Sequence, residues 1–481
     1  MPGSPGAAPH YRPRAPTNAL KELVEDSFEE LFRDWDERFR KGHGPLHPRL
    51  RKLFEEFGKC GDPHYGFLRL RCPECAQEKI VPFSCKSRGL CPSCSKKRAI
   101  AWAERMAGEV LPVVPYAGLV FTIPKMLRPH FLWDRTLYRD LCREAYAATL
   151  EFLRAQFPAL EGPVPAMVIS PQSFGSLLNF HPHLHAVLSQ GVFDKQGDFH
   201  PVPGDLDWRP LEELFRARTL KLMVRREKIT EDRATMLKSW VHSGFQVSGD
   251  RRIEAGDRSG LESLLAYMER APVSLERMEY RPDGRVLYRG NFHPALGTDH
   301  RLVSGIEFLA LLVPHVLLRY QITSRSYGAA STRIRGKFGW TGKAGKDAAR
   351  EGPPAVGVIE EEESGFVKMR RRNWARLIMK VWMEDPEKCP RCGEKMKVLA
   401  AISSPAQDGV IEKILRARGE WDPPWLRHRP ARGPPAGRAG GPQGPLPETR
   451  IEYEDDYDPS SEDIEIDRDF EDSFEDSPDG A

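Results

Sequence analysis

Residues 179–193 read NFHPHLHAVLSQGVF, a stretch in which three histidines alternate: His181, His183 and His185. Side chains along a β-strand point alternately to its two faces, so residues two apart share a face. The pattern therefore predicts a strand on which His183 and His185 present their imidazoles to one point. Two neutral imidazoles, completed by oxygen ligands, suit a divalent metal ion. The stretch thus predicts a sheet and a metal site on one of its faces.

The other face of this strand carries Leu184 and Leu188 and is expected to pack in an apolar core. With 14 histidines among 481 residues, a single His-x-His pair arises by chance about 0.4 times, whereas three alternating histidines arise in roughly one chain in a hundred. The run therefore favours a metal site over the alternative, a set of exposed or hydrogen-bonded histidines without a ligand.

Segments on both sides of this run alternate between strand and helix patterns. Apolar runs predict strands at 116–124, 166–175 and 245–254. Residues 137–157 and 261–270 repeat apolar residues at helical spacing. Strands interleaved with helices predict an α+β domain.

A cysteine cluster precedes this domain, with six of the nine cysteines inside residues 60–94. Two CxxC pairs, Cys72-Pro-Glu-Cys75 and Cys91-Pro-Ser-Cys94, are separated by 15 residues. Each pair can place two thiolates on a tight turn, and two such turns close a tetrahedron around Zn²⁺. A closed four-thiolate site leaves no position for a substrate, so this zinc is predicted to be structural.

The other cysteines leave alternatives open. Cys60, Cys85 and the nearby His64 could form a second site, exchange into the first, or be buried groups without a metal. Cys389 and Cys392 form half a site, to be completed by distant residues or across a dimer; otherwise they are an orphan pair.

The charge distribution indicates a polyanionic partner. The net charge of +3 hides an asymmetry, because residues 451–481 hold 15 acidic residues and one arginine, a net charge of −14. The other 450 residues therefore carry +17. A basic body with an acidic tail favours nucleic acid as the partner over a merely solvated basic surface.

The sequence does not indicate a membrane segment. No N-terminal stretch joins a basic region to an apolar core, so no signal peptide is expected. The most apolar stretch, 306–318, contains Glu307, Pro314 and His315 and is too short to span a bilayer. We expect no membrane partner and a cytoplasmic location.

A tyrosine on the predicted helix 261–270 is a candidate nucleophile. A tyrosine hydroxyl can attack a phosphodiester when a metal withdraws charge from the phosphate. Tyr267 lies roughly 110° from the centre of the apolar stripe of this helix, and Arg270, one turn on, can hold a phosphate. The stripe consists of Leu261, Leu264, Leu265 and Met268. The alternative is a partly buried tyrosine that only packs.

Several stretches also resemble a known family in their order and spacing. They are GFLRLRCPEC, SCKSRGLCPSC, SFGSLLNFHPHLHAVLSQGVF, WVHSGFQVSGDRRIE, LLAYMERAPVSLERMEY, RSYGAASTRIRG and DPEKCPRCGEKM. The chain resembles the rolling-circle insertion-sequence transposases of the HUH class, which carry an N-terminal transposase zinc-binding domain. The resemblance covers about 50–345, and weakly 380–415.

This resemblance implies an HUH-type antiparallel sheet with flanking helices, preceded by a small zinc-binding domain. It implies a transposase that cleaves and rejoins single-stranded DNA through a phosphotyrosine intermediate in rolling-circle transposition. Many relatives carry a second tyrosine four residues before the first, where this chain has Ser263. The chain therefore resembles the single-tyrosine branch.

The resemblance also assigns roles to the site residues. His183 and His185 would bind the catalytic Mg²⁺ or Mn²⁺, and Tyr267 would be the nucleophile. Gln172 and His181 are candidates for a third metal ligand, although the family often has asparagine at the position of His181. The sequence does not decide between these two residues.

The expected partner is single-stranded DNA at transposon ends. Basic side chains are expected to contact its backbone. They are Arg270, Arg325, Arg333 and Arg335. Two alternatives remain open: a plasmid-type rolling-circle replication initiator, and a non-catalytic zinc DNA-binding protein. The target sequence, the oligomeric state and the role of the acidic tail are not predicted.

These patterns divide the chain into five parts. They are a disordered segment at 1–16, the zinc-binding domain at 17–105, the endonuclease/transposase domain at 106–345, a basic helical region with a CxxC pair at 346–422, and a disordered Pro/Gly-rich and acidic tail at 423–481.

Overall fold

A computed structural model describes seven parts of the chain. They are residues 18–240, 243–293, 297–318, 321, 324–340, 375–380 and 385–423. Residues 1–16 and 424–481, which are the first expected disordered segment and all but one residue of the tail expected at 423–481, lie outside the described residues. So do residues 346–374 and 381–384 of the expected basic helical region.

The centre of the molecule is a five-stranded sheet in which all neighbouring strands are antiparallel. The strand order is β12-β4-β5-β3-β8. The strands are β3 (Tyr116–Thr122), β4 (Ala166–Phe174), β5 (Phe180–Ser189), β8 (Gln246–Ile253) and β12 (Arg325–Gly328). The expected α+β fold with an antiparallel sheet and flanking helices is confirmed, and the alternating histidines lie on β5, the middle strand.

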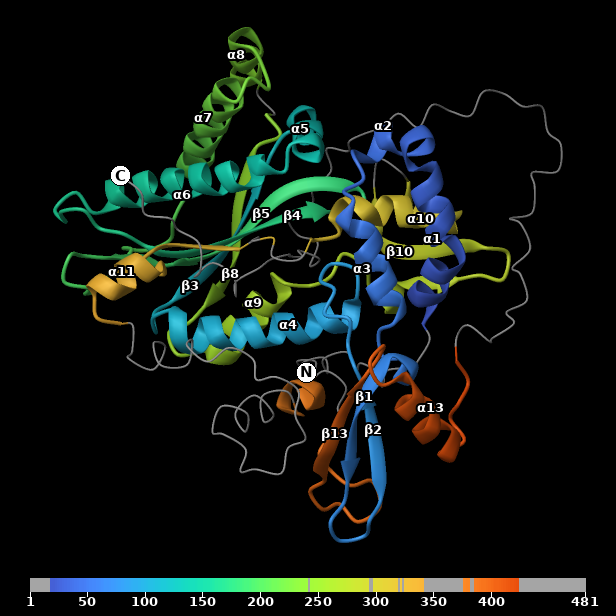
Figure 1. Cartoon of the computed structure of the whole chain (residues 1–481). Coiled ribbons are helices and arrows are strands. Elements are labelled where there is room, and N and C mark those ends of the chain that lie inside the picture. Colours follow the sequence, from blue (N-terminus) through green and yellow to red (C-terminus); the bar gives the residue numbers. More distant parts are fainter. Residues whose placement is uncertain are drawn as a thin grey trace, which may run out of the picture.

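Helices cover both faces of this sheet (Figure 1). One face packs against α6 (Thr136–Gln156) and α7 (Arg209–Arg225), where the predicted inward residues Leu184 and Leu188 are buried. This face is completely apolar at its centre. It forms the main core of the molecule, in which the apolar side chains of β5 are packed.

The opposite face packs against α4 (Pro92–Arg105) and α9 (Arg258–Tyr267). Val187 of β5 packs with this second core. Toward the start of β5 the face becomes polar, because the histidines replace aliphatic residues. Asp257 caps α9 by accepting a hydrogen bond at Oδ1 from the amide of Gly260 at 2.8 Å. The sheet thus has an apolar half under two helices and a polar half beside them.

A third core joins the N-terminal helices to a later part of the chain. Helix α1 (Ala19–Arg38) packs on α3 (Arg49–Gly58) and α10 (Gly305–Leu312), and α10 follows a small antiparallel sheet. That sheet has the order β11-β10-β9, with β9 (Met278–Tyr280), β10 (Arg285–His293) and β11 (Thr298–Ser304). The N-terminal helices therefore pack directly on residues predicted for the transposase domain.

A separate three-stranded sheet combines both ends of the described chain. The hairpin of β1 (Gly66–Arg71) and β2 (Glu78–Pro82) pairs with β13 (Lys397–Ser403), in the order β13-β1-β2. Helix α13 (Asp408–Ala417) packs on this sheet through Ile411 and Leu415. Residues 397–417 are thus integrated with the zinc-binding region, as the lower part of Figure 1 shows.

The described residues also contain shorter elements. They are α2 (Arg40–His43), α5 (Arg128–Trp133), α8 (Glu231–Ser239), α11 (Thr332–Lys337), β6 (Gly191–Phe193), β7 (Phe199–Pro201), a π-helical turn at Met106–Val110, and 3₁₀ turns at Pro63–Tyr65, Lys125–Leu127, Leu275–Arg277 and Val313–His315. None of the helices in this part of the chain combines the length and the apolar character that a membrane crossing requires.

Candidate active site and metal centres

His183 and His185 lie on the polar half of the α9 face of the central sheet. His183 is paired with Thr122 of β3 and Gln172 of β4, and directly paired residues of neighbouring strands share a face. His185 is paired in the same way with Ser170 of β4. The histidines are 4% and 3% exposed, and their ring centroids lie 4.8 Å apart. The face thus gathers two imidazoles and an amide in one buried polar patch.

The hydrogen bonds of this patch leave nitrogen lone pairs available. Nδ1 of His183 lies 2.6 Å from the carbonyl oxygen of His181. A carbonyl only accepts, so Nδ1 carries the proton and Nε2 keeps a lone pair. Nε2 of His185 and the Nε2 amide of Gln172 are both buried and have no hydrogen-bond partner among the described residues. Buried polar atoms without partners are costly and call for an explanation.

Burial also keeps both imidazoles neutral. Burial lowers the pKa of His183 to about 4, and the positive charge of Arg128 acts in the same direction. The pKa of His185 falls well below its usual value, first because of burial and then because of His183 and Arg270. Neutral imidazole is the form that binds a metal, and two imidazole nitrogens beside an amide oxygen, that of Gln172, are ligand types that fit a divalent ion.

Helix α9 places Tyr267 over the same face of the sheet. The leucines predicted for its apolar stripe are buried, and Tyr267 is half-buried at its last turn, as the helical spacing predicts. Gly118 of β3 allows the helix to lie close, because a Cβ there would be 3.3 Å from the side chain of Leu264. The guanidinium of Arg270 lies 5.4 Å from the centre of the Tyr267 ring. The charge of Arg270 also acts on the histidine pair, because it lowers the pKa of His185.

The other predicted DNA contacts lie in different places. Arg325 is paired with Ile169, whose side chain lies in the core under α6, so Arg325 is on the face opposite the histidines. Arg333 is exposed on α11. Arg335, on the same helix, donates a hydrogen bond to the carbonyl of Glu109. Of the four arginines, Arg270 is the one whose charge lowers the pKa of His185.

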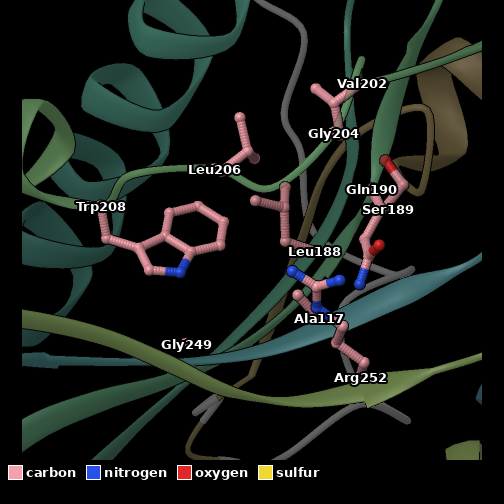
Figure 2. A pocket seen from close by; sticks show the side chains of 10 residues that line it. All are labelled: Ala117, Leu188, Ser189, Gln190, Val202, Gly204, Leu206, Trp208, Gly249 and Arg252. Carbon is pink, nitrogen blue, oxygen red and sulfur yellow. The ribbon is translucent and has the colours of Figure 1, made fainter.

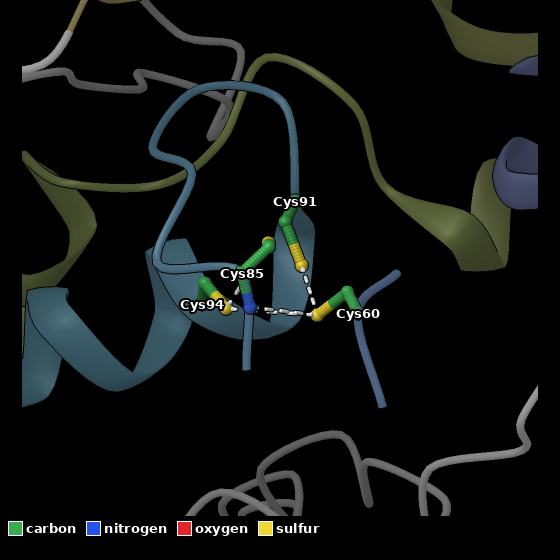
Figure 3. A group of neighbouring side chains, drawn as sticks. All are labelled: Cys60, Cys85, Cys91 and Cys94. Carbon is green, nitrogen blue, oxygen red and sulfur yellow. Dashed lines mark hydrogen bonds between the residues drawn. The ribbon is translucent and has the colours of Figure 1, made fainter. Parts of the chain in front are cut away.

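Four cysteines form a buried cluster at the start of α4 (Figure 3). They are Cys60, Cys85, Cys91 and Cys94. The Sγ atom of Cys60 lies 3.7 Å from that of Cys91 and 4.0 Å from that of Cys94, and Cys85 lies 3.7 Å from Cys94. Four sulfurs that each lie ~2.3 Å from a central zinc are about 3.8 Å apart. The cluster therefore has the dimensions of a four-thiolate zinc site.

A second cluster combines the first CxxC pair with the pair near the C-terminal end of the described chain. It contains Cys72, Cys75, Cys389 and Cys392. The Sγ atoms of Cys72 and Cys392, of Cys75 and Cys389, and of Cys75 and Cys392 are each 3.5 Å apart. Cys389 and Cys392 are therefore not an orphan pair in the folded chain.

The prediction that Cys72, Cys75, Cys91 and Cys94 close a single tetrahedron is wrong. The two CxxC pairs belong to opposite ends of the β1–β2 hairpin. Strand β1 has six residues, and at ~3.3 Å per residue its ends are about 17 Å apart. Cys72 and Cys75 follow its far end, whereas Cys91 and Cys94 pack beside α1 and α3. The two CxxC pairs are therefore close in sequence but far apart in space, because the length of the hairpin lies between them.

A count of cysteine pairs in the sequence could have indicated that there are two sites, but not which pairs share a site. The motif Cys-Pro-x-Cys occurs three times, as CPEC, CPSC and CPRC. Each motif supplies two of the four ligands of a zinc site, so three motifs leave one site with only two ligands. Cys60 and Cys85 supply the remaining half. A count of half-sites therefore predicts two complete sites from eight of the nine cysteines, with Cys142 left buried in the core under α6.

A pocket lies on the opposite face of the sheet, at its edge (Figure 2). Ala117, Leu188, Trp208 and Arg252 are among the residues that line it. None of the residues predicted for metal, catalysis or DNA lines it. The pocket is therefore separate from the histidine patch.

The fold and these sites define a class of protein: an antiparallel-sheet domain with a buried histidine pair, joined to a cysteine-rich metal-binding region. Comparison with protein families agrees with this description. Residues 31–123 match the family described as transposase zinc-binding domain, and residues 167–337 match a family described as putative transposase. The resemblance to insertion-sequence transposases with a zinc-binding domain is thereby confirmed.

Individual relatives support the same assignment. The chain is 25% identical over 375 residues to the transposase for insertion sequence element IS801 of Pseudomonas savastanoi pv. phaseolicola, which covers 73% of this chain and 83% of the relative. It is 26% identical over 332 residues to the putative transposase y4qJ of Sinorhizobium fredii (strain NBRC 101917 / NGR234), covering 64% and 80%. No solved structure matches the chain significantly.

Proposed function

We propose that this chain is a transposase that cleaves and rejoins single-stranded DNA through a covalent phosphotyrosine intermediate during rolling-circle transposition. The observation that supports the proposal most directly is the position of α9. Its last residue, Tyr267, and the following Arg270 lie over the face of the sheet that holds His183 and His185. One face of the sheet therefore carries the proposed nucleophile, a cation that can contact the phosphate, and the two imidazoles that can bind a metal.

His183 and His185 are the residues that would hold Mg²⁺ or Mn²⁺, with Gln172 as the candidate third ligand through its amide oxygen, because it is buried and is paired with His183 on the same face of the sheet. When bound, the ion would polarise the scissile phosphate and offset its developing negative charge. His181 contributes differently. Its carbonyl accepts the Nδ1 proton of His183 and so fixes the tautomer that offers Nε2.

The protein residues carry the chemistry as follows. The Tyr267 hydroxyl loses its proton and its oxygen attacks the phosphorus, so that a Tyr–O–P bond forms and the bond from phosphorus to the 3′ oxygen breaks. The 3′ oxygen leaves and takes up a proton to become a free hydroxyl. Arg270 offsets charge on the phosphate. Attack of a 3′ hydroxyl on the phosphotyrosine reverses the sequence and reseals a strand without ATP.

The proposal predicts a covalent adduct. Incubating the protein with single-stranded DNA from insertion-element ends and Mn²⁺ should yield a DNA-linked species whose peptide, by mass spectrometry, is modified at Tyr267. The Tyr267→Phe variant should give none. His183→Ala and His185→Ala should each lower the yield at least 100-fold, because the site loses a metal ligand.

Two results would contradict the proposal. One is an adduct that persists in Tyr267→Phe. The other is a yield unchanged in both histidine variants. An adduct formed on plasmid replication origins but not on insertion-element ends would favour the replication initiator instead. Tight DNA binding with no adduct in the parent protein would favour the non-catalytic zinc protein.

A further inference from the structure

We propose that Cys72, Cys75, Cys389 and Cys392 bind a second structural zinc ion, which fastens residues 385–423 to the β1–β2 hairpin. Each chain would then hold two zinc ions. The residues that match the transposase zinc-binding domain are 31–123, and neither matched region includes Cys389 or Cys392. The second site therefore extends the metal-binding region beyond the residues that the family of zinc-binding domains matches. The inference does not depend on the chemistry of Tyr267.

The sulfur positions are those of a shared centre. The Sγ atom of Cys75 is 3.5 Å from Cys389 and also 3.5 Å from Cys392, and Cys72 is 3.5 Å from Cys392. The four sulfurs lie within 4.8 Å of one another. Two disulfides would place each sulfur ~2 Å from one partner, whereas here Cys75 is equally close to two. Equal spacing is the arrangement that a tetrahedral ion requires.

Both halves of the site have the same backbone form. In the first, the amide of Ala76 donates to the carbonyl of Cys72 at 3.1 Å; in the second, the amide of Gly393 donates to the carbonyl of Cys389 at 3.0 Å. The residue after the second cysteine has a positive φ in each half, +57° at Ala76 and +80° at Gly393. Each CxxC pair is thus a tight turn that directs two thiolates to one point, although the halves are more than 300 residues apart in sequence.

The apolar core at this end of the sheet is small. The cluster beside the sulfurs has two buried side chains other than cysteines, Leu70 and Met396. At the other end, Phe67 and Ile402 pack with two residues of α13. Units with so few buried side chains generally need a metal or a disulfide for stability. A zinc ion would supply that stability, because binding energy at a structural site contributes to folding.

The two clusters also differ in exposure, which makes them distinguishable. All four cysteines of the Cys60 cluster are buried, whereas Cys392 is exposed and Cys75 is half-buried. A chelator should therefore reach the second site first. We expect the parent protein to contain two zinc ions and to release them to a chelator in two phases, at least tenfold apart in rate.

The test is the zinc content of the full-length protein, measured by mass spectrometry of the metal. The variant Cys389→Ser/Cys392→Ser should hold one zinc ion instead of two and should lose the fast phase of release. The control Cys142→Ala removes a cysteine that lies outside both clusters and should keep two. Cys392→His, which restores a zinc ligand, should also keep two.

A second measurement remains informative if the double variant folds poorly. In the parent protein, trypsin should cut α13, after Lys413 or Arg416, at least tenfold faster once the fast zinc fraction is removed. Two zinc ions in the double variant would overturn the proposal. So would a parent protein that holds one zinc ion and whose Cys389 and Cys392 are readily alkylated or joined in disulfides to Cys72 and Cys75.

Discussion

Three buried histidines show how hydrogen bonding separates a ligand site from a structural residue. Nε2 of His185 has no partner among the described residues. His315 is equally buried, yet its Nε2 lies 3.3 Å from the carbonyl of Leu178 and its Nδ1 2.9 Å from Oγ of Ser173. Both ring nitrogens of His315 are therefore used within the fold. His183 is intermediate, because one nitrogen is bonded to the backbone and the other is available. Burial alone does not identify a metal ligand; an available lone pair does.

His315 should contribute a measurable pH dependence to stability. Burial lowers its pKa to about 3, and the charges of Arg135 and His43 act in the same direction. In the unfolded chain its pKa is ~6.5, so between pH 6.5 and 3 the unfolded state binds a proton that the folded state does not. Stability from this residue is therefore complete above pH 6.5 and falls as the pH drops, by about 2 kcal/mol at pH 5.

The check is the free energy of unfolding of the parent and of His315→Gln at pH 7 and pH 5. The variant should be less stable at pH 7, because the buried hydrogen bonds of the ring change. The difference in the free energy of unfolding between the parent and the variant should be smaller at pH 5 than at pH 7, by about 2 kcal/mol. A gap that stays constant across this range would show that His315 does not titrate between the folded and unfolded states as described.

At the scale of elements, the proposed reaction depends on how closely α9 approaches the sheet. A Cβ at Gly118 would meet the side chain of Leu264 at 3.3 Å and that of Arg251 at 3.4 Å, so alanine there already requires a small shift. Valine adds two methyl groups at a packed interface, which generally costs 1–3 kcal/mol. The added volume should move α9 away from β3 and displace Tyr267 from the histidine pair.

Gly118→Val should therefore form the DNA adduct at least tenfold more slowly than the parent, while its zinc content stays the same. The Gly118→Ala variant should form the adduct at a rate between those of the parent and Gly118→Val. A rapid-quench time course of adduct formation measures the effect, and thermal melting shows whether each variant is folded at the assay temperature. A folded valine variant that reacts at the parent rate would mean that the position of α9 does not limit the reaction.

The contrast between the histidines and the cysteines shows what the sequence could predict. His183, His185 and the face of Tyr267 follow from the periods of a strand and a helix, so short stretches were enough to predict them. The partners of Cys72 and Cys75 depend on how a hairpin and a distant strand pair, which local patterns do not specify. For that reason the zinc-binding region and its metal type were predictable, whereas the grouping of the ligands was not.

At the scale of the whole molecule, segments that are far apart in sequence pack on one another. The N-terminal helices pack on α10, α4 packs on α9, and β13 pairs with β1. The cysteine-rich region and the domain predicted at 106–345 thus share cores. Because α4 carries Cys91 and Cys94 at its start and packs on α9 along its length, loss of zinc at the Cys60 cluster should also affect the position of Tyr267.

Charge is the other property of the whole molecule. Residues 451–481, which lie outside the described residues, carry a net charge of −14, and the rest of the chain carries +17. An acidic segment tethered to a basic body competes with DNA phosphates for the same cations. We therefore expect the tail to weaken nonspecific DNA binding.

Deleting 451–481 should tighten binding to random-sequence single-stranded DNA about tenfold at low salt, and the difference should shrink as salt rises because screening weakens both competitors. Fluorescence anisotropy titrations at several salt concentrations measure this. A full-length variant with the tail's aspartates and glutamates changed to asparagine and glutamine is the matched control, since it keeps the length and removes the charge. If the neutral tail weakens DNA binding as much as the native tail does, the tail acts by steric hindrance and not by its charge. If deletion leaves nonspecific affinity unchanged at low salt, the tail does not compete with DNA at all.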